Sequence, residues 1–147
     1  MEPSIAYART SDDVSIAWSS AGRPDAAAPT LVHLPGLPFG DFAAEWRIPS
    51  LQKTYARLAR SVRLIQLDGR GSGHSQRDVT DLSLEAMLRD VDAVVDAARL
   101  ERFAILGFYN SVTHAIACAA EHRERVTHLS LFGGALRGWI PRLLCPR

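Results

Sequence analysis

The sequence predicts an α/β domain in which a mostly parallel sheet is flanked by helices and carries a β-hairpin at one edge. From Thr30 onward, short apolar runs of strand length alternate with segments of helical periodicity, which is typical of a parallel sheet covered on both faces. Before Thr30, two β-rich segments follow each other across a polar turn, as in an antiparallel hairpin. The 147 residues correspond to one domain, and a hydrophobic share of 47% is enough to build a core.

The elements of the first third are a hairpin and one buried strand. The hairpin is expected over residues 4–9 and 14–19, joined by a turn at residues 10–13. A stretch rich in proline, glycine and alanine, residues 22–29, reads as a surface loop. The short apolar run at residues 30–34 follows this loop and is expected to be a strand.

The rest of the chain alternates between helices and strands. Leu51, Tyr55 and Leu58 fall at helical spacing and predict a helix over residues 49–60. The remaining elements are expected in this order: a strand over 62–67, an amphipathic helix over 83–100 with Ser83 as its N-cap, a strand over 103–106, a helix over 112–122 and a strand over 126–132.

Composition excludes several classes of function. Seventeen Lys and Arg against 16 Asp and Glu give a net charge of +1, which argues against a nucleic-acid binder held by a basic field. No apolar run approaches the ~20 residues that span a bilayer, and the N-terminus lacks the features of a secretory signal. Cys118, Cys145 and the five scattered histidines show no disulfide framework and no metal-ligand spacing. We therefore expect a cytoplasmic protein with no metal, no cofactor, no nucleic-acid partner and no membrane partner.

The most informative motif is at residues 107–111, where a strand runs into a helix with almost no loop between them. Gly107 and Ser111 are small residues placed two positions before and two positions after Tyr109. This is the spacing of a nucleophile elbow, G-x-S-x-G, whose central residue is held at unfavourable backbone angles. A phenol with a pKa of about 10 is a poor nucleophile unless a base activates it. We expect Tyr109 to be inactive, and Ser111 to be a small buried residue and not a displaced nucleophile.

A second motif is the glycine-rich turn at residues 68–75. Gly69, Gly71 and Gly73 are spaced G-x-G-x-G, which differs from the G-x-G-x-x-G of dinucleotide-binding loops. Asp68 and Arg70 are charged residues at the end of an apolar strand, and we expect them to hold the turn through hydrogen bonds.

Taken together, three segments make the chain resemble the N-terminal half of an α/β-hydrolase. Residues 33–38 resemble the family's oxyanion loop, residues 67–75 its D-x-R-G-x-G-x-S turn, and residues 107–111 its elbow. The helix and turn at residues 115–126 extend the resemblance, which covers residues 4–135. The resemblance is strongest to the bacterial-type hydrolase-like domains that are found alone or fused to adenylate cyclases and LuxR-type regulators. Degenerate elbows are common in those domains.

The resemblance implies a role for particular residues. The backbone N–H groups of Leu37 and Asn110 would form the oxyanion hole. Six further residues would shape the glycine-rich turn and the elbow: Asp68, Arg70, Gly71, Gly73, Gly107 and Ser111. Three others would line the pocket: His33, Gly36 and Trp46.

The chain also departs from the family pattern. The family's acid and histidine follow the sixth strand, whereas this sequence stops at Arg147, shortly after its expected sixth strand. We therefore expect a partial domain over residues 1–135 that lacks the lid and the last strands, with a tail of unclear structure at 136–147. A truncated or frameshifted end would explain that tail.

Three functions follow as expectations. The first is a catalytically impaired protein, a pseudoenzyme that is either a remnant or a domain that binds a small hydrophobic ligand or ester. The second is an ester or amide hydrolase whose missing half is supplied by another chain or lost from this one. The third is an interaction module that uses an exposed sheet edge, which would also permit homo-oligomers.

Overall fold

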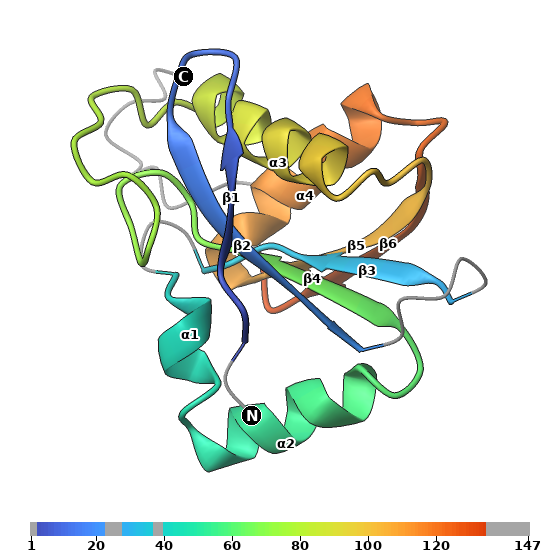
Figure 1. The fold of residues 1–147 in the computed structure, drawn as a ribbon. Coiled ribbons are helices and arrows are strands. Elements are labelled where there is room, and N and C mark those ends of the chain that lie inside the picture. The colour runs from blue at the N-terminus through green and yellow to red at the C-terminus, as the bar shows by residue number, and fades with distance from the viewer. Residues whose placement is uncertain (1–2, 23–27, 37–39, 135–147) are drawn as a thin grey trace, which may run out of the picture.

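A computed structural model describes residues 3–22, 28–36 and 40–134 of the protein, and these form a six-stranded sheet with helices on both faces (Figure 1). The expected tail at 136–147 and most of the expected surface loop lie outside the described residues. The strands are β1 (Ala6–Arg9), β2 (Ser15–Gly22), β3 (Thr30–His33), β4 (Arg63–Leu67), β5 (Phe103–Phe108) and β6 (Val126–Phe132). The helices are α1 (Phe42–Glu45), α2 (Pro49–Leu58), α3 (Leu84–Ala97) and α4 (Val112–Glu121), with a 3-10 turn, η1 (Tyr109–Ser111), before α4. No helix in the described ranges is long and apolar enough to cross a membrane.

The strand order is β1-β2-β4-β3-β5-β6. The β1–β2 and β2–β4 pairs are antiparallel, and the β4–β3, β3–β5 and β5–β6 pairs are parallel. The predicted fold class, a mostly parallel sheet with an N-terminal hairpin at its edge, is confirmed. The hairpin turn is closed by a hydrogen bond from the Thr10 N–H to the Val14 carbonyl, and Asp13 adopts a positive φ of 68°.

The structure corrects several of the expected elements. β2 continues three residues beyond its expected end, to Gly22, because its pairing with β4 extends to Arg63. β5 continues two residues beyond the expected end, to Phe108, because its pairing with β6 extends to Phe132. The short helix α1 was not predicted, since four residues are too few to show a helical period. Its N-cap is Asp41, whose carboxylate accepts a hydrogen bond from the Ala44 N–H at 2.9 Å.

The helices divide into two layers. α3 and α4 cover one face of the sheet, and α1 and α2 lie on the other (Figure 1). The larger core cluster lies under α3 and α4 and includes Ile16, Val32, Ile65, Phe103 and Ile105 of the strands with Val91, Val94 and Val95 of α3. The smaller cluster on the α2 side is built around Trp46, Tyr55 and Leu64.

The β6 edge of the sheet differs from the core in that large apolar side chains are exposed there. Leu129, Leu131 and Phe132 expose 40%, 45% and 55% of their surface, and β6 pairs only with β5 among the described strands. This edge therefore presents apolar side chains and unpaired backbone groups together.

Candidate functional site

The strand-to-helix turn at the end of β5 has the backbone of an elbow. Tyr109 adopts a φ of +51°, a conformation that costs a non-glycine residue about 1–3 kcal/mol. A Cβ atom added at Gly107 would lie 2.7 Å from the Cβ of Ala115 and 3.1 Å from the Cα of Val112. Only glycine fits at position 107, because β5 and α4 approach so closely there.

Ser111 holds this turn in place. Its side chain is fully buried, and its Oγ accepts a hydrogen bond from the Phe108 N–H at 2.7 Å. The same hydroxyl lies 2.9 Å from the Phe108 carbonyl oxygen, to which it can donate. A hydroxyl that is buried and bonded to the backbone on both sides stabilises the elbow, and it is not presented to a substrate.

The Tyr109 side chain lies among aromatic rings at the surface. It is 59% exposed, and its ring meets Phe108 and Phe132 edge-on, at centroid distances of 5.1 Å and 6.0 Å. Phe108 and Phe132 are themselves stacked at 4.8 Å. Within the described part of the chain, no hydrogen bond joins the phenol to a base that could activate it. We call Phe108, Tyr109 and Phe132 the elbow aromatic cluster.

The segment after β3 lies beside the elbow. The Leu34 N–H donates to the Leu106 carbonyl at 3.0 Å, and a Cβ atom added at Gly36 would lie 3.7 Å from Oδ1 of Asn110. Gly36 and Asn110 are thus neighbours in space although more than seventy positions separate them in the sequence. Leu37 lies outside the described residues, so an oxyanion hole formed by Leu37 and Asn110 stays a prediction.

Asp68 organises the turn after β4. Its buried carboxylate accepts hydrogen bonds from the Phe42 N–H at 2.9 Å and from the His74 N–H at 2.8 Å. Burial raises the pKa of Asp68, and these two N–H donors act in the opposite direction. Gly73 has a φ of +48°, and any Cβ atom there would collide with the Asp68 carboxylate.

Arg70 ties this turn to α3 and to the hairpin. The buried guanidinium donates to Asp90 from Nε at 2.9 Å and to both carboxylate oxygens of Asp12 at 2.7 and 3.0 Å. These bonds hold the pKa of the Asp12 carboxyl well below its usual range. Gly71 adopts a φ of +78° within the same turn. The contacts of Asp68, Arg70, Gly71 and Gly73 are therefore those of a structural turn.

His33 lies between the elbow and α2. Its ring is 6.3 Å from Phe108 and 5.8 Å from Tyr55, measured between centroids, and its Nδ1 is 3.4 Å from Nε2 of Gln66. Burial lowers the pKa of His33 to about 4, so the imidazole is neutral at pH 7.

Sequence reasoning missed the polar network that supports His33. Oε1 of Gln66 accepts a hydrogen bond from the Trp46 indole N–H at 2.7 Å, and the Tyr55 hydroxyl donates to Glu45 at 2.6 Å. Gln66 was the available signal, since it is a polar residue inside the apolar run of β4. This network places Trp46 on the α2 side, against Gln66 and Tyr55. β4, which carries Gln66, is separated from β5 by β3.

Among the residues that the structure describes, one cluster of candidate metal ligands is present. Ligand atoms of Asp41, Asp68 and His74 lie within 4.8 Å of one another. Both Asp68 oxygens already accept backbone N–H bonds, and Asp41 caps α1. The fold itself accounts for these carboxylates, so the cluster does not indicate a metal centre.

Comparison with known proteins gives the chain a family context. No protein-family model matches. RutD of Agrobacterium fabrum, assigned as a carbamate hydrolase, is 36% identical over 87 residues, which is 58% of this chain and 31% of RutD. Among solved structures, the enol-lactonase from Burkholderia xenovorans LB400 superposes with a TM-score of 0.76 and 25% identity. That match covers 90% of this chain and 48% of the lactonase.

Further structures agree on the fold. The meta-cleavage product hydrolase from Pseudomonas fluorescens IP01 matches with a TM-score of 0.71 at 24% identity, over 88% of this chain and 45% of that hydrolase. The chain thus spans less than half the length of these solved enzymes. The six-stranded sheet, the elbow after β5 and these similarities together show that the chain has the α/β-hydrolase fold, over part of the length of the enzymes it resembles.

Proposed function

We propose that this chain is a non-catalytic hydrolase-fold protein that binds a small apolar ligand or ester at the elbow aromatic cluster. One observation carries the proposal: the elbow conformation is occupied by Tyr109, whose phenol contacts two phenylalanine rings and no base in the described part of the chain. The strained backbone that presents a nucleophile in hydrolases here presents an aromatic side chain. Exposed, clustered rings favour binding of flat apolar groups.

The matched variant Tyr109→Phe tests this proposal, because it removes only the hydroxyl. We expect the wild-type chain and Tyr109→Phe to hydrolyse 4-nitrophenyl butyrate no faster than buffer. We also expect no intact-mass shift after exposure to a fluorophosphonate probe. A hydrolysis rate that depends on the hydroxyl, or an adduct on Tyr109, would overturn the proposal.

Binding is tested separately from catalysis. If the elbow aromatic cluster binds the ester, Phe132→Ser should weaken the binding of 4-nitrophenyl butyrate about tenfold, since one ring of the platform is lost. Tyr7→Ser is the matched control, because Tyr7 is equally exposed but lies on β1 at the other edge of the sheet. Equal affinities in the two variants would contradict ligand binding at the cluster.

A second candidate is an ester or amide hydrolase completed by another chain. The length comparison favours it, because more than half of each solved enzyme lies outside the matched region. A stoichiometric partner should then co-purify with the chain, and Tyr109→Ser in that complex should gain ester hydrolysis. A complex in which Tyr109→Ser stays inactive would rule this candidate out.

A third candidate is an interaction module that uses β6, including self-association through that strand. The exposed Leu129, Leu131 and Phe132 favour it, because an uncharged apolar edge readily accepts another strand. Leu131→Lys should convert an oligomer to a monomer in light scattering. A wild-type chain that is already monomeric would remove the self-association proposal.

A further inference from the structure

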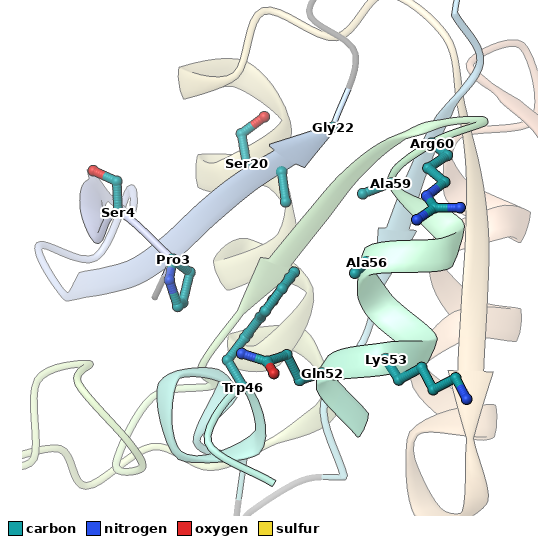
Figure 2. A pocket seen from close by; sticks show the side chains of 11 residues that line it. Pro3, Ser4, Ser20, Gly22, Trp46, Gln52, Lys53, Ala56, Ala59 and Arg60 are labelled. Carbon is teal, nitrogen blue, oxygen red and sulfur yellow. The ribbon is translucent and has the colours of Figure 1, made fainter. Parts of the chain in front are cut away.

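A cavity of about 650 Å³ lies between α2, the end of β2 and the segment before β1 (Figure 2). This volume falls within the range of about 300–1,000 Å³ that is typical of small-molecule sites. β2 is separated from β5 by β4 and β3, so the cavity is distinct from the elbow. None of the candidate functions of the elbow uses this cavity.

Small residues create the space. Ala21 of β2, Ala56 of α2 and Ala59 directly after α2 line the hollow, together with Pro3. Gly22 adopts a φ of +93°, and a Cβ atom there would lie 2.5 Å from the Val62 carbonyl oxygen and would collide with that of Ala59. The end of β2 is therefore packed tightly on the segment after α2. The alanines beside this contact have short side chains and leave the cavity unfilled.

The Trp46 side chain, which lines the cavity, is held in place by a hydrogen bond and by ring packing. Trp46 is only 3% exposed, its indole N–H donates to Gln66 at 2.7 Å, and its ring packs 5.6 Å from Tyr55. An aromatic surface held by hydrogen bonding and packing does not have to be ordered when a ligand binds, which favours affinity.

The charge around the cavity has one sign. Lys53 and Arg60 line its α2 side, and none of the lining residues is acidic. α2 itself contains no acidic residue. Neither cation has a carboxylate partner in the ranges that the structure describes. In Figure 2 the side chains of Ala56, Ala59 and Trp46 border the hollow, whereas Lys53 extends outward at its rim on a flexible stem.

We propose that this cavity binds a small amphipathic carboxylate. The apolar body would lie on Trp46 between Ala21 and Ala56, and the anionic head would reach the rim, where Lys53 and Arg60 attract it. Gln52 also lines the cavity and can donate a hydrogen bond to the same head group.

The test is a titration of the full chain with decanoate, followed by ¹⁵N NMR, with decanamide as the neutral counterpart of equal length. We expect shifts at the Trp46 indole N–H and at the amides of Ala21, Ala56 and Ala59, and about tenfold tighter binding of decanoate than of decanamide. Added salt should reduce this difference, because the rim charges are exposed.

Two sets of variants separate charge from space. The double variant Lys53→Gln with Arg60→Gln should weaken decanoate about tenfold and leave decanamide unchanged. Arg57→Gln is the matched control, because Arg57 lies on the same helix but does not line the cavity. Ala56→Phe should fill the space and abolish binding of both compounds, and the exposed position tolerates a larger side chain. Shifts confined to β6, equal affinity for the two compounds, or equal effects of the Arg57 and rim variants would overturn the proposal.

Discussion

The turns after β4 and β5 both leave the carboxyl ends of parallel strands, but they are held by different physical means. The β4 turn is stabilised by charge, because Asp68 and Arg70 are buried and bonded to backbone, to Asp90 and to Asp12. The β5 turn is stabilised by close packing, because Gly107 lets the strand and helix touch and buried Ser111 ties its ends together. In the β4 turn, the side chains of Asp68 and Arg70 are hydrogen-bonded within the protein. The β5 turn instead places an exposed side chain with a strained backbone, Tyr109, at the surface.

The difference shows which turn is available for function. In the β4 turn, Asp68 and Arg70 are both hydrogen-bonded to groups within the fold. At the β5 turn, Tyr109 keeps an exposed phenol at a φ of +51°. Backbone strain persists where the surrounding structure enforces it, and such strain is concentrated at functional sites. The turn after β5 therefore keeps the backbone conformation of an elbow even though its central residue is tyrosine.

The largest effect is expected from removing the charge that holds the β4 turn. Arg70→Met leaves the buried Asp90 without its cation, and should lower the free energy of unfolding by about 3–5 kcal/mol in urea denaturation. Arg9→Met is the control, because the Arg9–Asp13 pair is exposed and its loss should be barely resolved. Comparable losses in the two variants would contradict a buried network that stabilises the turn.

The next effect is a dependence of stability on pH beside the β5 turn. His33 has a folded pKa of about 4 against 6.5 unfolded, so the unfolded chain binds more protons between these values and stability falls as pH drops. The loss from pH 7 to pH 4 should be at most about 3 kcal/mol, and less where water reaches the ring.

The His33→Gln variant isolates this contribution. Burial raises the pKa of Asp68, Asp90 and Glu45, which favours the folded state as these groups gain protons and opposes the effect of His33. Urea denaturation at pH 7 and pH 4 should therefore show a smaller fall for His33→Gln than for the wild type. Parallel pH profiles would show that His33 does not contribute.

A smaller effect is expected from crowding the β5 turn. Gly107→Ala places a methyl group 2.7 Å from the Ala115 Cβ, and should cost about 1–3 kcal/mol of stability through overpacking. Gly36→Ala is the control, since its nearest neighbour would be 3.7 Å away and no loss is expected. The urea midpoints of the two variants provide the comparison, and a tolerated Gly107→Ala would show that close packing does not hold the elbow.

The smallest effect comes from the strain itself. Tyr109→Gly and Tyr109→Ala both remove the exposed ring, but only glycine accepts the positive φ without a steric penalty. The glycine variant should be more stable than the alanine variant by about 1 kcal/mol in thermal or urea unfolding. The reverse order would mean that the turn relaxes to an unstrained conformation when the ring is absent.

The alternation of strands and helices, the hairpin and the two turns could be read directly from the sequence. Periodicity reports which residues share a face, so the long α3 stripe and the apolar run of β4 were visible without coordinates. The spacing of small residues around Tyr109 was likewise enough to predict a strand-to-helix turn, because close approach of two backbones requires small side chains.

Strand order, and with it the composition of the candidate sites, was decided only by the tertiary structure. Local patterns do not encode that β4 lies between β2 and β3, and this placement brings Gln66 between His33 and Trp46. The same placement puts Trp46 at the floor of a cavity beside α2, away from the elbow. The edge position of β6, beside β5 alone among the described strands, goes with its exposed side chains. Periodicity and the spacing of small residues indicate which parts of the chain can form strands, helices and tight turns. Contacts between residues distant in the chain decided which of them share a site, since such contacts depend on packing across the whole sheet.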